Sequence, residues 1–387
     1  MRISLALLFL LSCPSLVLAE SRELKIATYN IASGLRNAGD LEQKLRQKND
    51  PKLIKIAAII QHVRADILLL NEFDYQVGAQ LGKLFQQNYL SQAQLGQAAI
   101  DYPYTYSNSV NTGINSGLDL NGDGKTNGPA DAWGFGFFTG QYGMQILSRY
   151  PIDTAAIRSF QKLKWASMPQ ALQPIDPNTN KPWYPTEVWN ELRLSSKSHW
   201  DVPITIAGKT LHFLIMHPTP PVFDGPEDRN GRRNHDEIRL FADYIQPNKS
   251  GWIIDDKGQA GGLPENSLFV IAGDLNADPF DGDSTNQAIA QLLQHPGINN
   301  DCTPQSSGAV LDSEKKAGVN ISHKGNSATD TGQFNPAKVG NLRLDYVLPA
   351  KQIRIDRCGV FWPSSDEEGA NWVGASDHHL VWVDITL

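Results

Sequence analysis

Short runs of apolar residues recur along the chain, and most of them have polar residues at one end or directly beside it. Runs of this length and composition predict β-strands. They cover residues 24–29, 67–70, 144–147, 211–216, 268–272, 342–344 and 379–383. Because stretches with helical spacing lie between several of these runs, the pattern predicts an α/β fold.

Three stretches have the apolar spacing of helices. Asp50 and Pro51 supply an N-cap and a proline at the first helical position, and apolar residues then repeat from Leu53 to Val63. We predict a second helix that starts near Asp236 and a third that follows Ser284, each with apolar residues on one face.

Two segments look like insertions into this pattern. Residues 90–140 are rich in glycine, asparagine, glutamine and aromatic residues, whereas residues 158–203 contain many prolines, which disfavour long helices, and several tryptophans. The sequence has no internal repeat and no clear linker, so we expect a single domain over residues 20–387 with large loops. The first insertion contains four clustered aromatic residues for which core packing is expected in preference to pocket lining: Trp133, Phe135, Phe137 and Phe138.

Residues 1–19 have the features of a signal peptide. Arg2 is followed by an apolar stretch, and Val17-Leu18-Ala19 resembles a small-residue cleavage site. The apolar stretch is too short to span a bilayer and no later run is long enough, so no transmembrane segment is predicted. A lipoprotein anchor at Cys13 is the alternative, although the apolar run continues past that cysteine. We therefore expect a secreted or periplasmic protein.

Composition and charge restrict the range of functions. Of the 387 residues, 41% are hydrophobic and 19% are charged, which is enough for a sizeable core. After loss of Arg2 the chain has 33 basic and 41 acidic side chains, a net charge of −8. This acidic balance disfavours tight, non-specific binding of nucleic acid. The two cysteines left after cleavage, Cys302 and Cys358, are expected to pair in an oxidising compartment, with two buried thiols as the alternative.

Polar residues that suit catalysis stand at the ends of the apolar runs. In chain order they are Asn30, Glu72, His217, Asp274, Asn276, Asp345, Asp377 and His378. Each has an ordinary explanation when taken alone, because Asp and Asn are common turn residues and a lone histidine is usually a satisfied polar group. As a set they comprise four carboxylates, two amides and two imidazoles, which the burial of apolar runs does not explain.

This set of side chains suits the hydrolysis of phosphoesters. Carboxylates such as Glu72 and Asp377 bind Mg²⁺ or Mn²⁺, and the cation neutralises phosphate charge. Amides such as Asn30 and Asn276 orient phosphate or water without adding negative charge, and histidine exchanges protons near neutral pH. General acid–base catalysis contributes about 10²–10⁴-fold in rate, so charge stabilisation and positioning must supply most of the acceleration.

The same positions carry a resemblance to a known family. The matching pieces occur in family order and are Thr28–Asn30, Asn71–Glu72, Gly143–Pro151, His217–Pro218, Gly273–Asn276, Leu344–Val347 and Ser376–His378. Over residues 23–387 the chain resembles the endonuclease/exonuclease/phosphatase superfamily, and the ordered set is more specific than any one motif. The resemblance implies a deoxyribonuclease I-like fold, which is a four-layer α/β/β/α sandwich with two packed mixed β-sheets.

The resemblance also implies a role for each metal-binding residue. Glu72 would be the principal ligand of a Mg²⁺ or Mn²⁺ ion, and Asn30 and Asp377 would lie near the metal or the phosphate. Whether the site holds one metal ion or two stays open.

For proton transfer the resemblance implies a second group of residues. Asp274 and Asn276 would position the attacking water and a phosphate oxygen. His378, oriented by Asp345, would contact the phosphoryl group as a base or charge stabiliser, and His217 would serve the leaving group. Which histidine is the acid and which is the base stays open.

Two histidines refine this comparison. The resemblance places a histidine at His217 in the deoxyribonuclease, sphingomyelinase and phosphatase branches but not in the abasic-site repair branch. His379 stands where many relatives have a smaller or apolar residue, and we predict that it is a side chain at the start of the last strand.

Two further clusters are candidate binding sites. Oxygen-bearing side chains alternate as in the start of a calcium loop at Asp119, Asn121 and Asp123, and Asp131 lies next to the position of the missing late glutamate. This predicts a structural Ca²⁺, with a Gly/Asn-rich turn as the alternative. A basic cluster after His217 is the candidate for binding a second anionic group of the substrate, with a solvated loop as the alternative; it comprises Arg229, Arg232 and Arg233.

The sequence therefore predicts a secreted, divalent-metal-dependent hydrolase that acts on phosphodiester or phosphomonoester bonds by attack of water on phosphorus. The substrate stays open among nucleic acid, nucleotide, lipid and sugar phosphate, and an extracellular nuclease and a sphingomyelinase are the specific alternatives. A non-catalytic, calcium-dependent binding module on the same fold is the alternative from a different class. No obligate protein partner is expected.

Overall fold

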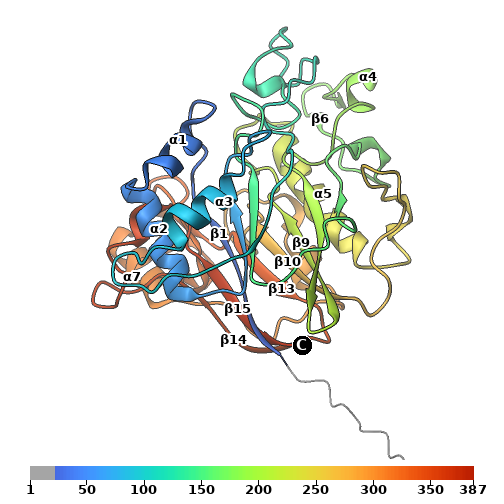
Figure 1. Ribbon diagram of the computed structural model, residues 1–387. Helices are drawn as coiled ribbons and strands as arrows, with labels where there is room; N and C mark the ends of the chain where they lie inside the picture. The colour runs from blue at the N-terminus through green and yellow to red at the C-terminus, as the bar shows by residue number, and fades with distance from the viewer. Residues whose placement is uncertain (1–21) are drawn as a thin grey trace, which may run out of the picture.

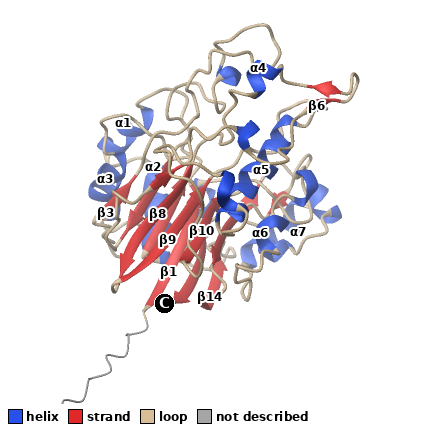
Figure 2. Ribbon diagram, turned by 90° about the vertical axis from the view of Figure 1, so that its right-hand side faces the viewer, coloured by secondary structure: helices blue, strands red, loops and turns tan. Residues whose placement is uncertain are grey.

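Two mixed β-sheets pack face to face and helices cover their outer sides, as Figures 1 and 2 show. The computed structural model describes residues 22–387, and the predicted signal peptide lies outside the described residues. The α/β fold and the four-layer arrangement predicted from the sequence are thus confirmed. In the described part of the chain, no helix is both long enough and apolar enough to cross a membrane.

The first sheet has six strands in the order β14-β15-β1-β2-β4-β3. Its strands are β1 (Glu23–Asn30), β2 (Ile67–Asn71), β3 (Tyr104–Tyr106), β4 (Met144–Ser148), β14 (Arg354–Val360) and β15 (Val381–Thr386). Strands β1 and β2 run parallel, whereas β1 and β15 pair antiparallel. The two central strands therefore have their carboxyl ends at the same edge of the sheet.

The second sheet has five strands in the order β13-β10-β9-β8-β5. They are β5 (Arg158–Ser159), β8 (His199–Ile206), β9 (Lys209–Met216), β10 (Leu268–Asp274) and β13 (Asp345–Pro349). Strands β9 and β10 run parallel and the other neighbours antiparallel. Two short hairpins lie outside these sheets and pair β6 (Ile175–Asp176) with β7 (Lys181–Pro182) and β11 (Gly332–Gln333) with β12 (Asn341–Leu342).

Most of the α-helices cover the outer faces of the sheets, whereas α4 lies among the loops at one end of them (Figure 2). They are α1 (Asp40–Gln47), α2 (Pro51–Val63), α3 (Leu81–Phe85), α4 (Thr186–Trp189), α5 (Arg229–Tyr244), α6 (Ala290–Leu293) and α7 (Ser307–Lys316). A π-helical turn forms η1 (Gln86–Leu90). Short 3₁₀ turns form η2 (Pro129–Asp131), η3 (Trp165–Ser167), η4 (Ser250–Trp252), η5 (Thr285–Gln287), η6 (Gly318–Ser322), η7 (Ser327–Thr329) and η8 (Val373–Ala375).

Alternation along the strands divides the core into two layers. In β1, Leu24 and Ile26 face the second sheet, whereas Ala27 and Tyr29 point to the other side of the strand and face the helices α1 and α2. Such alternation is what a strand buried on both faces requires, because successive side chains point to opposite sides. The sheets are therefore held together by apolar packing along their length.

Several boundaries differ from the sequence prediction. Helix α2 begins after the Asp50 cap as predicted, and Asp50 accepts bonds from the amides of Lys52 and Leu53. Helix α5 starts at Arg229, seven residues before the predicted start. The prediction placed the start too late because the first two turns carry polar side chains and show no apolar stripe. The helix predicted after Ser284 is interrupted, since Asn286 has a left-handed φ of 50° and only the short α6 follows.

The predictions around the last strands also need correction. The apolar run at residues 342–344 forms only the end of the short strand β12, and Asp345 begins β13 where the sequence predicts that it closes a strand. The last strand starts at Val381, so the prediction that His379 begins it is wrong. The His379 ring is buried and stacks on Trp362 with 3.6 Å between ring centroids, which keeps it out of the ladder.

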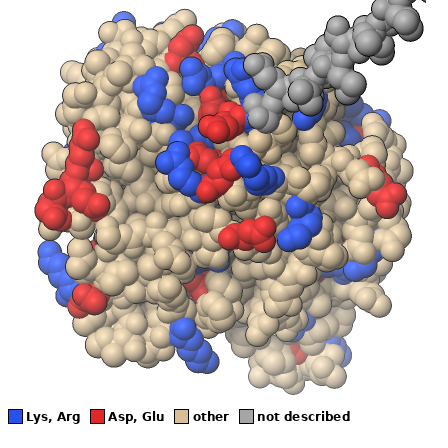
Figure 3. Space-filling view, turned by 90° about the horizontal axis from the view of Figure 1, so that it is seen from below, with Lys and Arg blue, Asp and Glu red and all other residues tan. Residues whose placement is uncertain are grey.

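The two segments predicted as insertions contain little regular structure. Figure 1 shows most of their loops at the end of the sheets opposite the chain's C-terminus, whereas the start of the first insertion runs back past α2, where Arg64 donates to the carbonyl of Ala98. The prediction of core packing for the clustered aromatic residues is wrong for Phe135 and Phe137, which are 53% and 59% exposed. The opposite face, seen from below in Figure 3, has basic and acidic side chains interspersed, without a large patch of one sign.

A disulfide joins Cys302 to Cys358 of β14, with 6.2 Å between the Cα atoms, as the even cysteine count predicts. It closes a sequence separation of 56 residues and ties the segment that follows α6 to the edge strand of the first sheet. A link of this kind restricts the unfolded chain, so it stabilises this edge of the fold.

Candidate active site

The predicted catalytic residues meet where the carboxyl ends of the central strands of both sheets come together. Asn30 ends β1, Glu72 follows β2, His217 follows β9 and Asp274 ends β10. The Nδ2 atom of Asn30 donates to Oδ2 of Asp274 over 2.9 Å, which joins the two sheets at this point. Asp345 belongs to the same group because it starts β13 directly opposite Asp274.

A second amide links the sheets directly beneath this group. The Oδ1 atom of Asn71 accepts bonds from the hydroxyl of Thr28 in its own sheet (3.2 Å) and from the backbone amide of Asp274 in the other (3.3 Å). Asn30 also donates to Oε1 of Glu72 over 3.2 Å. Buried bonds of this kind are strong because the surroundings are poorly polarisable, so they fix the carboxylates relative to each other.

The backbone has unusual conformations at the residues whose side chains point toward the site. Glu72 and Asn276 have left-handed φ angles of 57° and 51°, which cost about 1–2 kcal/mol for a residue with a Cβ atom. Gly273 has a φ of 156°, and a Cβ atom there would lie 1.9 Å from the carbonyl oxygen of Met216. The strands therefore end in turns whose geometry aims Glu72 and Asn276 toward the site.

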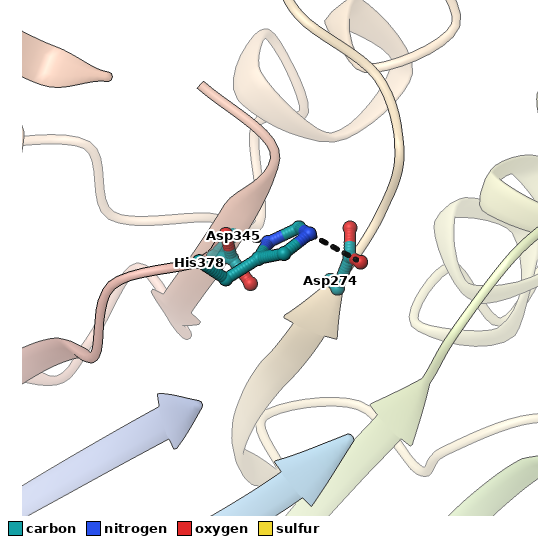
Figure 4. Close-up of side chains that lie close together, drawn as sticks. All are labelled: Asp274, Asp345 and His378. Atoms are coloured by element: carbon teal, nitrogen blue, oxygen red, sulfur yellow. Dashed lines mark hydrogen bonds and ion pairs between the residues drawn. The ribbon is translucent and has the colours of Figure 1, made fainter. Parts of the chain in front are cut away.

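His378 lies between two buried carboxylates, as Figure 4 shows. Its Nδ1 atom is 2.8 Å from Oδ2 of Asp345, and its Nε2 atom is 3.6 Å from Oδ2 of Asp274. The hydroxyl of Thr331 donates to the same oxygen of Asp345 over 2.7 Å. The chain Thr331–Asp345–His378 thus holds the imidazole ring in a fixed orientation.

The carboxylates control the charge of His378. Burial alone would lower the pKa of His378, but the carboxylates of Asp345 and Asp274 outweigh burial and hold that pKa well above its usual value. Burial also acts to raise the pKa of Asp274, yet the charges of His378 and His217 outweigh it, and the pKa falls well below the ordinary range. At neutral pH the site therefore contains an imidazolium beside an ionised Asp274.

His217 has the opposite preference. Its Nε2 atom is 3.4 Å from Oδ2 of Asp274, and its Nδ1 atom is buried without a hydrogen-bond partner among residues 22–387. Burial, with a contribution from the neighbouring charge of Lys197, lowers the pKa of His217. One carboxylate, Asp274, is therefore shared by a histidine that favours the charged form and one that favours the neutral form.

The residues predicted to bind metal offer hard oxygen ligands at the rim of this group. Glu72 is half-buried and Asp377 is exposed, and both carboxylates act electrostatically on Lys52, so they face a common region. Asn30 turns its Nδ2 atom toward Glu72 and Asp274, since its Oδ1 atom accepts from the amide of Ala32. The carboxylates of Glu72 and Asp377 suit Mg²⁺ or Mn²⁺.

A different trio has the closest spacing of potential metal ligands in the described part of the chain. Ligand atoms of Asp274, Asp345 and His378 lie within 4.8 Å of one another. A protonated imidazole has no free lone pair for a metal, and both nitrogens of His378 point at carboxylates. We therefore interpret this trio as a proton-transfer group.

The site forms one side of a cavity of about 920 Å³. Glu72, His217, Asp274, Asn276, Asp377 and His378 line this side. The remaining walls come mainly from the two insertions, from the loop that follows His217 and from the segment around β12; their apolar members include Leu120, Ala132, Phe135, Tyr184, Leu192, Val222, Phe223, Phe334 and Val339.

The predicted basic cluster is only partly directed to this cavity. Arg229 and Arg233 line it, whereas Arg232 points away and donates to the carbonyl of Gln173. Arg229 is paired with Glu227, and Arg233 donates to three backbone carbonyls. The donors of Arg233 are therefore largely used within the protein, whereas Arg229 has its charge offset by Glu227.

The predicted calcium loop is closed by its own hydrogen bonds. Asp119 accepts from the amides of Gly122, Asp123 and Gly124, and Asp123 accepts from Asn121 and Lys125. The buried Asp131 accepts from the amides of Leu120 and Gly128. The loop is thus ordered by these bonds, and calcium binding stays a prediction.

Two residues of the site have no signal in the sequence. Thr331 orients Asp345 from an irregular segment between η7 and β11, and threonine in a loop is unremarkable. Lys197 lies within the second insertion, yet it is only 6% exposed and lines the cavity beside His217. A lysine in a Ser-rich stretch reads as a surface residue, so only the tertiary structure identifies it.

Comparison with known proteins gives the family. Solved structures to which the chain is similar include an endonuclease/exonuclease/phosphatase from Beutenbergia cavernae (16% identity, 95% of this chain and 72% of that chain, TM-score 0.49). Others are sphingomyelinase C from Streptomyces griseocarneus (15% identity, 94% and 99%, TM-score 0.49) and Staphylococcus aureus beta toxin with bound magnesium (14% identity, 94% and 99%, TM-score 0.46). No curated protein sequence matches the chain. Residues 27–378 match the Endonuclease/Exonuclease/phosphatase family, and the chain therefore belongs to that family.

Proposed function

We propose that the protein hydrolyses a phosphoester by attack of water on phosphorus, with the help of a divalent cation. The observation that carries this proposal is the single ionised carboxylate, Asp274, shared by two histidines of opposite proton affinity. Hydrolysis needs one group that accepts the proton of water and one that stabilises or protonates the leaving oxygen. A pair of histidines with pKa values displaced in opposite directions meets both needs at one pH.

The surrounding residues have separable roles in this proposal. Neutral His217 accepts a proton from the water that Asp274 and Asn276 orient. Charged His378, held by Asp345, contacts the phosphoryl oxygens and supplies a proton to the leaving group. These roles make His217 the base and His378 the acid, which reverses the leaving-group role that the resemblance implies for His217.

Glu72 and Asp377 would hold the cation, with Asn30 fixing the position of Glu72. When bound, Mg²⁺ or Mn²⁺ would neutralise charge on the phosphate, and without it four carboxylates would repel an anionic substrate. The donor set is all oxygen, which favours these ions over zinc.

The charge of the cavity favours a substrate with one phosphate over a long nucleic acid. Arg229 and Arg233 are already partnered, and the opposite wall contains Asp278, Asp281 and Asp283. A nucleic-acid groove normally follows the phosphate backbone with unpaired basic side chains. An extracellular nuclease is therefore the weaker alternative.

The disulfide supports the proposal of a secreted or periplasmic location. Disulfides persist in oxidising compartments and are rare in the cytosol. Secretion is tested by expressing the full chain with and without residues 1–19 and measuring the protein in the medium and periplasm.

A substrate panel on purified protein tests the activity. Plasmid DNA, RNA, bis-p-nitrophenyl phosphate, p-nitrophenyl phosphate, sphingomyelin and inositol phosphates would be assayed with Mg²⁺, with Mn²⁺ and after chelation. We expect hydrolysis of a small phosphoester that is lost on chelation and restored by either metal. Activity that persists unchanged without divalent metal would contradict the proposal.

A matched pair of variants tests the metal assignment. Glu72→Ala should lower kcat/KM on the best substrate by at least about 100-fold, because the principal ligand is lost. Glu191→Ala removes an exposed carboxylate in a surface ion pair with Lys164 and should leave kcat/KM unchanged. Full activity of the Glu72 variant would show that the metal is held elsewhere.

A further inference from the structure

The cavity is far larger than a phosphate group requires, and its far walls are apolar. Phe135 and Phe223 line it although they are 53% and 88% exposed. Exposed aromatic side chains beside a catalytic group are costly to keep in water, and they usually mark a binding surface. Leu120 and Val222 also line the cavity.

The walls come from segments that are not needed to build the catalytic group. Leu120 and Phe135 belong to the first insertion, Leu192 belongs to the second, and Val222 and Phe223 follow His217. The catalytic residues, in contrast, stand at strand ends. The insertions therefore determine what accompanies the phosphate in the cavity.

We propose that the substrate is a phosphoester whose ester group is large and apolar, and that this group lies against the wall formed by Leu120, Phe135, Val222 and Phe223. This inference rests on the proposed function and names its substrate class. Because Glu227 offsets the charge of Arg229 and Arg233 donates to three backbone carbonyls, the wall favours contact with an apolar group over a second phosphate.

Phosphonates that cannot be hydrolysed give a direct test on the Mg²⁺-loaded protein. Inhibition constants would be measured for inorganic phosphate and for methyl-, butyl- and octylphosphonate below micellar concentration, with phenyl- and naphthylphosphonate as the aromatic series. We expect affinity to rise at least tenfold from methyl to octyl or from methyl to naphthyl, since each buried methylene contributes to binding. The stronger series identifies an alkyl or an aryl ester.

Variants localise the effect. Phe135→Ser combined with Phe223→Ser should abolish the dependence on size and leave inorganic phosphate binding unchanged. Phe280→Ser is the matched control, since Phe280 is 65% exposed but is not among the lining residues. Equal affinity for all phosphonates would overturn the inference alone, whereas failure of phosphate and methylphosphonate to bind would overturn the proposed function.

A second, independent observation concerns Lys197. Its side chain is buried, and its Nζ atom has one hydrogen bond, to the carbonyl of Pro218 over 3.3 Å. The nearest charges that act on it include Glu237, Glu72 and Asp274, and the carboxylate of Glu237 is occupied by the backbone amides of Ser196 and Thr219. A buried ammonium with so few partners destabilises the folded protein. Its presence beside the cavity therefore suggests a role in binding.

We infer that Lys197 contacts the phosphoryl oxygens of the substrate and stabilises charge there. It lines the cavity on the same side as His217 and Asp274. An ammonium group has three donors, so two remain for phosphate oxygens after the bond to Pro218.

Substitution by methionine separates this role from a structural one. Lys197→Met should bind inorganic phosphate at least tenfold more weakly and lower kcat/KM about 100-fold, while the melting temperature of the ligand-free protein stays equal or rises. Lys209→Met removes an exposed lysine that does not line the cavity and should change none of these quantities. A lower melting temperature with unchanged phosphate affinity would show that Lys197 only supports the Pro218 loop.

Discussion

The catalytic group and the apolar wall of the cavity face each other but are built on different principles. The proposed catalytic group combines buried side chains with the partly buried Glu72 and Asn276 and the exposed Asp377, and hydrogen bonds cross between the sheets. Its members are Asn30, Glu72, His217, Asp274, Asn276, Asp345, Asp377 and His378. The wall consists of irregular loops that expose aromatic side chains. A rigid scaffold can hold one chemistry in place while loops change the group that is accepted. Substitutions in one part at a time test whether the two parts act independently.

The largest effect is expected from Asp274→Asn. The variant removes the charge shared by His217 and His378 and leaves the shape of the site almost unchanged. We expect kcat/KM to fall about 10³–10⁴-fold, as when a buried carboxylate that orients a catalytic histidine becomes an amide. Steady-state kinetics measures the loss, and circular dichroism checks that the fold is kept. Less than a tenfold loss would remove Asp274 from the mechanism.

An intermediate effect, on stability, is expected at the base of the wall. Asp236 is buried and accepts from the indole of Trp165 (2.6 Å) and the amide of Leu172 (2.7 Å), so it ties the second insertion to α5. Asp236→Ala leaves these donors unpaired and should cost about 3 kcal/mol of unfolding free energy. We expect this variant to change kcat/KM on a small phosphoester by a smaller factor than it changes the ratio of the affinities for large and small phosphonates.

Urea denaturation of this variant provides the measurement, and a surface substitution provides the control. Asp301→Ala removes a carboxylate that is 72% exposed and paired with Lys351. Its midpoint should not move, because exposed ion pairs contribute little. If Asp236→Ala abolished activity on small substrates as well, the wall and the catalytic group would not be separable.

The smallest effect is expected from pH, through His199 at the junction of the second insertion and β8. Its Nδ1 atom contacts the hydroxyl of Ser195 and its Nε2 atom contacts the carbonyl of Glu237, an arrangement that suits the neutral ring. Burial lowers the pKa of His199 from 6.5 to about 4. Protonation therefore favours the unfolded chain, and stability is lost as the pH falls from 6.5 toward 4.

This shift corresponds to about 2 kcal/mol lost at pH 5 relative to pH 8. Denaturant midpoints measured between pH 5 and 8 for the native protein and for His199→Gln would isolate the contribution. The variant should show a flatter profile over this range. Parallel profiles for the two proteins would show that protonation of His199 does not cause the loss of stability at low pH.

The position of most residues of the proposed catalytic group at strand ends was predictable from the sequence, because these residues follow a local pattern. The strand that ends in Asp274 is a continuous apolar run, the strand that ends in Asn30 is predominantly apolar, and the polar residue after such a run is expected at a strand end. Asp345 was harder, since the short apolar run before it belongs to a different strand.

The wall was not predictable, because its residues acquire their position only through tertiary contacts. Phe135 resembles a core residue, and Lys197 resembles a surface residue. The early start of α5 was missed because Arg229 and Arg233 turn toward the cavity and the carbonyls around it, so no apolar stripe marks the first turns. Residues whose roles depend on loops far away in the chain leave no periodic signal.

The amide of Asn71 has a consequence for how the molecule assembles. Its oxygen accepts one bond from a residue 43 positions away and another from a residue 203 positions away, in the other sheet. Contacts between such distant segments form slowly, because long loops must close first. The active centre can therefore exist only after the sheets have docked, and the return of hydrolysis during refolding would report the last step of folding and not the first.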